Sequence, residues 1–324
     1  MKSLICINTC NRLDLLRFYS ESYYRFCLSN PEFDFIVSLD GNEQDYLNFF
    51  EERKIPYISS EERAGIGIAK NRVLDKLPDY DFYFFIEDDT EIKDLSYFDE
   101  QIRISQKTAI PHFSAFEKSR ILDKKSEFEL GEQKIIQSMQ GSAQVNFFSG
   151  EGLRKVGGWH TEFAKYKRFG HTEHSYRFVN AGLMDYPFNV VESFITDCFD
   201  FHDPPTVTRS TKFELNPKTN LALVEEAIID QKLSSFPIEV PGSYSFGNLD
   251  SWRDQPQPEP FLTVQERKAF LSERYFEEGS NKLFRRDKDG LGMLWKSIVY
   301  SPSGPDTGKK IKTLMRHLPL LFNR

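Results

Sequence analysis

The sequence predicts an α/β domain built on a largely parallel β-sheet. Short apolar runs rich in strand-forming residues alternate along the chain with segments whose apolar side chains recur at helical spacing. The runs cover residues 3–8, 33–42, 54–60 and 81–89, and the helical segments cover 13–30 and 65–77. This alternation is typical of parallel strands joined by helices. Ligands of such sheets bind beyond the carboxyl ends of the strands, where this chain places polar groups.

Composition and charge narrow the class of protein. The chain has 324 residues, of which 39% are hydrophobic and 28% charged, as in globular domains. The net charge of -7 argues against a general nucleic-acid role, because nucleic-acid-binding proteins usually carry a basic surface. Four cysteines without paired spacing indicate reduced thiols. The apolar run in "MKSLICINTC" is too short for a signal peptide, and no run approaches the ~18 apolar residues of a membrane span, so we expect a cytoplasmic protein.

The second half of the chain has weaker signals. It predicts a strand, a turn and a short helix over 142–159, a helix over 169–183, a strand over 194–205 and a helix over 219–233. From residue 236 the chain is rich in Pro, Gly and polar residues, and it then turns helical at a capping box formed by Thr263 and Glu266. We therefore expect a domain over 1–235 and a mostly helical C-terminal extension over 236–324.

The stretch "FYFFIEDDTEI" places three carboxylates, Glu87, Asp88 and Asp89, directly after a buried strand. If strand geometry continues, alternation puts Glu87 and Asp89 on one face and Asp88 on the other. Two carboxylates on one face suit Mg²⁺ or Mn²⁺, which prefer oxygen ligands and share them with a diphosphate. A solvated acidic turn is the alternative.

Five motifs resemble, in order and rough spacing, those of the GT-A glycosyltransferases, and they look most like the inverting, nucleotide-sugar-dependent family 2 type. They are "LICINTCNR", "FIVSLDGN", "GIGIAKNRVLD", "FFIEDDTEI" and "FFSGEGLRKVGGWHTEF…FGHTEHSYR", and they cover roughly residues 1–205. The resemblance implies the Rossmann-like GT-A fold of nucleotide-diphospho-sugar transferases. Its nucleotide-binding half would span 1–100 and its acceptor half 101–235.

The resemblance also implies roles at the donor site. The acidic triplet looks like the family's "DXD" motif, in which Asp89 would hold the metal, Glu87 would assist and Asp88 would face the ribose or the sugar. His202 would be a further metal ligand, with a structural histidine as the alternative. The loops would add the nucleotide- and donor-binding residues Thr9, Asn11, Arg12, Asp40, Arg63, Lys70 and Asn71. The alternatives are a polar turn for the first three, a turn aspartate for Asp40, and a helix with solvated bases for the rest.

The acceptor half carries the remaining candidates. Trp159 offers a flat face for a sugar ring, and Gly158 allows close backbone approach. His174 is the third acceptor-binding candidate. Simple core packing is the alternative for Trp159. The segment "GHTEHSYR" has one carboxylate where the family usually has several. An inverting transfer needs a base for the acceptor hydroxyl, and we choose Glu173, with His171 as runner-up. The alternative is an ion pair of Glu173 with Arg177 at i,i+4.

Together these features predict a metal-dependent glycosyltransferase. It would use Mn²⁺ or Mg²⁺ to move a sugar from a nucleotide diphosphate to a glycan or lipid-linked glycan. The resemblance implies UDP as the nucleotide and surface polysaccharide synthesis as the process. A sugar-nucleotide nucleotidyltransferase and a non-catalytic binding module are the alternatives. The tail over 308–324 is basic and partly apolar, so it could rest on the inner face of an anionic membrane or pack as an ordinary helix.

Overall fold

The structure is a computed structural model, and it describes residues 1–166, 169–201, 229–254, 259–284, 289–302, 304 and 306–317. The chain divides into two compact units. The first comprises Met1–His202 with Ser210–Pro258, and the second comprises Asp203–Arg209 with Glu259–Arg324. Residues 236–254, which the change in composition assigns to the extension, therefore belong with the first unit.

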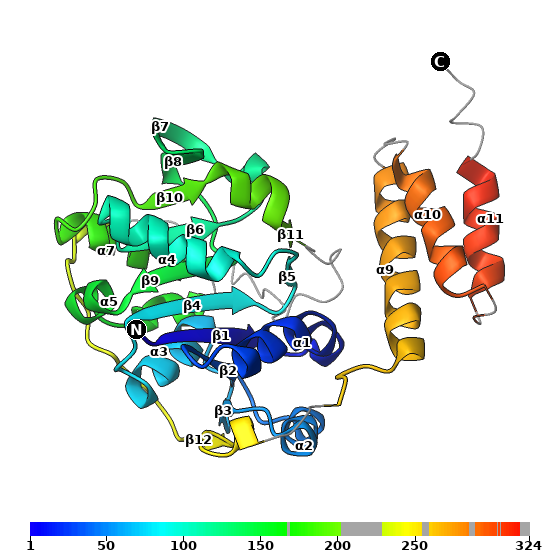
Figure 1. Cartoon of the computed structure of the whole chain (residues 1–324), viewed down its shortest axis with the longest axis horizontal. Helices are drawn as coiled ribbons and strands as arrows, with labels where there is room; N and C mark the ends of the chain where they lie inside the picture. Colours follow the sequence, from blue (N-terminus) through cyan, green and yellow to red (C-terminus); the bar gives the residue numbers. More distant parts are fainter. Residues whose placement is uncertain are drawn as a thin grey trace, which may run out of the picture. The chain divides into compact units, whose positions relative to one another are not determined.

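The described part of the first unit is organised around a seven-stranded sheet in the order β12-β3-β2-β1-β4-β9-β6 (Figure 1). The four strands from β3 to β4 run parallel to one another, whereas β12 pairs antiparallel with β3, and β9 pairs antiparallel with β4 and β6. The strands are β1 (Ser3–Thr9), β2 (Phe33–Leu39), β3 (Tyr57–Ser60), β4 (Phe82–Glu87), β6 (His112–Ala115), β9 (Val145–Ser149) and β12 (Tyr244–Gly247). The predicted α/β fold with a parallel central sheet is confirmed.

Helices cover both faces of this sheet, because adjacent side chains of a strand point to opposite faces. On one face, Phe84 of β4 contacts Phe98 of α4 with ring centroids 5.0 Å apart, and Phe26 of α1 joins them. On the other face, Phe85 lies in a buried cluster with residues of α3, α5 and α7, Phe178 among them. The helices of this unit are α1 (Leu13–Ser29), α2 (Gln44–Arg53), α3 (Ile66–Lys76), α4 (Tyr97–Thr108), α5 (Gly150–Val156), α6 (Thr161–Tyr166) and α7 (Gly170–Asn180).

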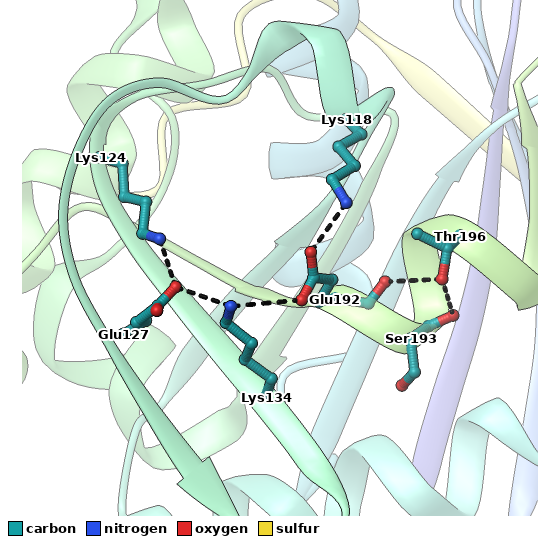
Figure 2. Close-up of polar contacts among 7 residues, drawn as sticks. All are labelled: Lys118, Lys124, Glu127, Lys134, Glu192, Ser193 and Thr196. Atoms are coloured by element: carbon teal, nitrogen blue, oxygen red, sulfur yellow. Dashed lines mark hydrogen bonds and ion pairs between the residues drawn. The ribbon is translucent and has the colours of Figure 1, made fainter.

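Two smaller sheets flank the main one. The first consists of β10 (Phe188–Val191), β8 (Gln133–Gln140) and β7 (Leu122–Leu130). Ion pairs lie on the surface near this sheet (Figure 2). Lys118, in the 3-10 turn Lys118–Arg120, and Lys134 both pair with Glu192. Lys124 and Lys134 both pair with Glu127. Such exposed pairs add little stability each.

The second small sheet pairs β5 (Thr90–Ile92) with β11 (Phe199–Phe201). The strand predicted over 194–205 is shorter than expected, because a π-helical turn at Phe194–Cys198 precedes β11. Tyr23 stabilises the start of β5: its hydroxyl donates to the carbonyl of Thr90 at 2.7 Å and accepts from the amide of Ile92 at 2.9 Å.

The segment 236–254 is a strap along the first unit, drawn in yellow in Figure 1. The amide of Phe236 donates to the carbonyl of Val156 at 2.9 Å, and the amide of Gly158 donates to the carbonyl of Phe236 at 3.1 Å. Further along, β12 adds to the free edge of β3. Arg253 lies in the 3-10 turn Trp252–Asp254 and donates a hydrogen bond to the carbonyl of Cys27 at 2.7 Å. Pairing thus covers a sheet edge that would otherwise be open.

The second unit is helical in its described part, with α9 (Val264–Phe284), α10 (Asp289–Tyr300) and α11 (Thr307–His317). The predicted capping box is confirmed: the Thr263 amide donates to Glu266 Oε2 at 2.7 Å, and the Glu266 amide donates to Thr263 Oγ1 at 3.2 Å. Leu283, Leu291 and Leu294 form the small core. Among the described helices, none combines the length and the apolar character needed to cross a bilayer.

Three sequence-based expectations fall at least partly outside the described residues. They are the position of His202, the helix over 219–233 and the end of the basic tail after residue 317.

Substituting Gly157 tests how firmly the strap is fixed. Gly157 has a φ of 76°, and a Cβ there would lie 1.8 Å from the carbonyl oxygen of Phe236. Gly131 has a φ of 62° with no atom within 4 Å of its Cβ position, so Gly131→Ala is a matched control for backbone strain alone. We expect Gly157→Ala to lower the free energy of unfolding by about 3 kcal/mol and Gly131→Ala by about 1 kcal/mol in urea denaturation. Equal losses of unfolding free energy in the two variants would show that the contact of the strap with Gly157 does not stabilise the fold.

Candidate functional site

Three parallel strands deliver polar side chains to one edge of the main sheet. In the register of the sheet, Thr9 of β1 pairs with Leu39 of β2, and Asn8 pairs with Glu87 of β4. Asp40 and Asp88 therefore flank Thr9 from the two neighbouring strands. This edge is where the fold class places ligands.

The acidic triplet ends β4 and turns back on the first loop. Thr9 Oγ1 donates to Asp88 Oδ2 at 2.6 Å. Arg12 pairs with both aspartates, with Nη1 at 2.7 Å from Asp89 Oδ2 and Nη2 bonded to Asp88. The condition for placing Asp88 and Asp89 on opposite faces is not met, because β4 ends at Glu87 and a turn replaces the strand geometry.

Burial and mutual repulsion disfavour negative charge on two of these carboxylates. Burial, with the charge of Asp89, raises the pKa of Glu87 to about 8, although Lys70 and Arg12 oppose the shift. Burial raises the pKa of Asp88 to about 7, with Arg12 again opposing. Both shifts are those expected of acids that lack a sufficient positive partner.

The carboxylates also have capacity left for a cation. Asp89 Oδ1 is buried and accepts no hydrogen bond within the described part of the chain. Across those same residues, no group of three or more His, Cys, Asp or Glu side chains is arranged as a complete metal site. The oxygen donors of the triplet suit Mg²⁺ or Mn²⁺, which commonly take one or two carboxylates and complete their shell with substrate phosphates and water.

Lys70 brings a second positive charge close to the triplet. Its side chain is 3% exposed, and Nζ lies 4.9 Å from the Trp159 ring centroid and 5.6 Å from that of Phe85. Burial lowers the pKa of Lys70 to about 8, and the charge of Glu87 opposes this shift. Lys70 thus remains near the sequence-predicted donor site.

The other predicted donor-binding residues divide into two groups. Arg63 is half-exposed and bonds to Asn11 Oδ1 and Glu43 Oε1, so it links two loops at the carboxyl edge. Asp40 instead accepts the amides of Ala64 and Gly65, both at 2.8 Å, at the start of α3. These contacts hold a loop that is distant in the sequence, so they differ from the local turn aspartate that was the alternative for Asp40.

Asn71 and the predicted acceptor residues lie in the core. The Asn71 side chain bonds to the carbonyl of Trp159 at 2.9 Å, the amide of Trp159 at 2.7 Å and the carbonyl of Glu239 at 3.0 Å. Trp159 is 2% exposed and stacks on His174 with centroids 4.2 Å apart. This burial favours simple core packing, the alternative given for Trp159, over the predicted stacking on a sugar ring. Gly158 packs against Asn71, where a Cβ would lie 2.7 Å from Oδ1.

The two candidate bases have different surroundings. Glu173 is 3% exposed and pairs with Arg177, with Oε1 2.8 Å from Nε and Oε2 3.0 Å from Nη2. This ion pair is the structural alternative for Glu173. His171 is half-buried; burial and the charge of Lys70 lower its pKa to about 4.

Sequence reasoning missed Tyr46 of α2. Its hydroxyl accepts a hydrogen bond from the Arg12 amide at 2.6 Å and lies 3.3 Å from Thr9 Oγ1. These contacts hold the first loop in place. The helical spacing of Tyr46, Phe49 and Phe50 marks a buried face but gives no sign of this contact.

The pH dependence of stability tests the electrostatics of the triplet. Above about pH 7 the histidines are uncharged in both the folded and the unfolded state, whereas the folded protein still binds protons on Glu87 and Asp88 more tightly than the unfolded chain, so its free energy of unfolding should fall as the pH rises from 7 to 8. We expect Glu87→Gln to flatten this slope in thermal melts recorded in EDTA. Glu91→Gln, on the adjacent β5, is the control and should leave the slope unchanged. A Glu87→Gln slope equal to that of the wild type would contradict the raised pKa.

Comparisons with known proteins identify the fold. No protein-family model and no curated protein matches the chain. S. aureus TarS 1-349 in complex with UDP aligns with a TM-score of 0.50 and 11% identity, over 98% of this chain and 89% of that one. The mannosyltransferase PcManGT from Pyrobaculum calidifontis, with GDP-Man and Mn²⁺, aligns at 0.42 and 10%, over 99% and 87%. Another TarS structure aligns at 0.44 and 14%, over 59% of this chain and only 35% of that one. On the first of these matches, the chain has the GT-A fold of nucleotide-sugar transferases.

Proposed function

We propose that this protein is a metal-dependent glycosyltransferase that moves a sugar from a nucleotide diphosphate to a glycan hydroxyl with inversion. One observation carries the proposal: a buried acidic turn lies beside the first loop at the carboxyl edge of a parallel sheet with the GT-A fold. UDP is the favoured nucleotide, since the fold match at a TM-score of 0.50 is a UDP complex.

The acidic turn suits the binding of a donor diphosphate through a divalent cation. Asp89 and Glu87 would hold the cation, which offsets charge on the leaving diphosphate. Asp88 is held by Thr9 and would face the sugar or the ribose. His202 stays a proposed further ligand; it follows β11, whose last residue Phe201 pairs with Thr90 next to the turn.

Arg12 is the internal counter-charge of this turn. Its guanidinium spans Asp88 and Asp89, where it partly neutralises the repulsion between them. A cation on Asp89 would compete with this contact, and the released guanidinium would be free to bind phosphate oxygens in a bidentate manner. Arg12 would thus neutralise the two aspartates before the donor binds and contact the donor phosphates afterwards.

We favour His171 over Glu173 as the base, which reverses the order expected from the sequence. Glu173 is bonded to Arg177 through both oxygens inside the core. The proposal for His171 rests on its partial exposure, because its imidazole is neutral at physiological pH but the pKa of about 4 makes it a weak base. The inversion follows from a single displacement, in which the hydroxyl attacks the anomeric carbon as the nucleotide leaves.

The acceptor and the place of work are proposed on the sequence resemblance. A glycan or lipid-linked glycan of surface polysaccharide synthesis, handled at the inner face of the membrane, suits the basic tail over 308–324. A nucleotidyltransferase would need a triphosphate substrate, and a non-catalytic module would bind the donor without turnover. Mass spectrometry of products from UDP-sugars or UTP separates these three functions.

Nucleotide titration tests the proposed donor site. We expect calorimetry to show UDP binding in Mn²⁺, with at least a tenfold loss of affinity in EDTA or in Asp89→Asn, because the diphosphate then lacks its cation. GDP and CDP identify the base preference, and Glu91→Gln is the matched acid-to-amide control. UDP binding that is unchanged in EDTA and in Asp89→Asn would contradict the metal site.

A second pair of variants tests the base. We expect His171→Ala to lower kcat for sugar transfer by about 10²–10⁴-fold, with UDP affinity within twofold of the wild type. Glu173→Gln should instead lower the free energy of unfolding by about 3–5 kcal/mol, because it breaks a buried ion pair, while kcat of the folded protein changes less than tenfold. Loss of kcat in Glu173→Gln alone would restore Glu173 as the base.

A further inference from the structure

The helical second unit carries large apolar side chains on its outside. Trp295 and Val299 of α10 are 59% and 60% exposed, and Ile311 and Met315 of α11 are 46% and 61% exposed. The two residues of each pair are four positions apart, so each pair lies on one side of its helix. Each helix buries different residues against the unit, such as Leu294 of α10. The exposed pairs are therefore not part of the described core.

The two outward faces share a five-residue pattern. Residues 295–299 read "WKSIV" and residues 311–315 read "IKTLM", so each has an apolar residue, a lysine, a hydroxyl residue and two apolar residues. In both, the first residue, the lysine and the fifth residue are exposed. The fourth residues, Ile298 and Leu314, are half-buried, and Leu314 packs on the core of the unit. Two successive helices thus present the same combination of apolar and basic side chains.

The charge of this region is opposite to that of the whole chain. Between residues 289 and 317 the sequence has five basic residues and two acidic ones, in a protein with a net charge of -7. Lys310 is buried and donates to Ser272 Oγ at 2.6 Å, so it serves the interior. The other four are exposed: Lys296, Lys309, Lys312 and Arg316.

We propose that the outward faces of α10 and α11 form a docking surface for an anionic lipid bilayer. Trp295, Val299, Ile311 and Met315 would enter the interface between headgroups and acyl chains, and the exposed basic side chains would contact the headgroups. A helix of this composition lies in the plane of the interface, where tryptophan is favoured. This surface belongs to the second unit and is distinct from the donor site.

Charge favours a bilayer over a second copy of the chain. In a two-fold dimer the same patch meets itself, so the lysines and the arginine would face like charges across the interface. An anionic bilayer offers the opposite charge, and each basic residue near it strengthens binding about fivefold. The expected binding is therefore strong on anionic vesicles, weak on neutral ones and sensitive to salt.

Tryptophan fluorescence of the full chain reports this binding directly. The other two tryptophans, Trp159 and Trp252, are 2% and 4% exposed, so a change in polarity around Trp295 dominates the spectrum. We expect vesicles of phosphatidylcholine with phosphatidylglycerol to shift the emission to the blue and to protect it from acrylamide. Phosphatidylcholine alone should do neither. No shift and no co-flotation with anionic vesicles would overturn the proposal.

Matched variants separate the surface from general charge and hydrophobicity. Lys296→Glu/Lys312→Glu should lower vesicle co-flotation at least tenfold, whereas Lys107→Glu/Lys268→Glu, with the same change in net charge, should not. Trp295→Ser/Met315→Ser should lower it at least tenfold, whereas Val264→Ser, at another exposed site, should leave it unchanged. Far-UV circular dichroism and thermal melts identify variants that remain folded. Equal losses of vesicle binding in test and control variants would overturn the proposal. It would also be overturned if the test variants kept their vesicle binding and instead changed the oligomeric state of the protein, measured by light scattering.

Discussion

The repulsion among three carboxylates at the end of β4 is the constraint on which the site depends. A chain that buries Phe82–Ile86 as a central strand brings Glu87, Asp88 and Asp89 into an environment with little water. Charge in such a place has to be offset by protons, by cationic side chains or by a metal ion. The first two are visible: the pKa of Glu87 and that of Asp88 are raised, and Arg12 spans the two aspartates. A metal-bound diphosphate would be the third, and the proposed function rests on it.

The surrounding structure holds this turn in place from several elements. β1 supplies Thr9 to Asp88, and α2 supplies Tyr46 to the loop that carries Arg12. The parallel register of β1 with β4 fixes the distance between the loop and the turn. Lys70 is buried beside the rings of Phe85 and Trp159, and its charge favours the ionised form of Glu87.

Much of the fold could be predicted because its signals are local. Buried strands such as β1 and β4 are short apolar runs, and the helix end at Gly157 and the capping box at Thr263 depend on a few adjacent residues. The strap could not be predicted, because β12 is held by an edge of β3 far away in the sequence. Likewise β7 could not be predicted, because it is an exposed, charged strand without a clear apolar pattern.

For the same reason, only part of the candidate site could be predicted from the sequence. Carboxylates directly after a buried strand are a local signal, so the acidic turn could be found from the sequence. Whether Trp159 faces the solvent or the core depends on residues outside its own motif, here Phe148 and His174. The pair of Glu173 with Arg177 could be expected from its i,i+4 spacing, but its burial could not. A crystal structure of the complex with UDP and Mn²⁺ is the most direct measurement. We predict an anomalous manganese peak bonded to a carboxylate oxygen of Asp89, with Arg12 no longer spanning Asp88 and Asp89. Bound UDP without manganese, and with Arg12 still across both aspartates, would contradict the metal-dependent site.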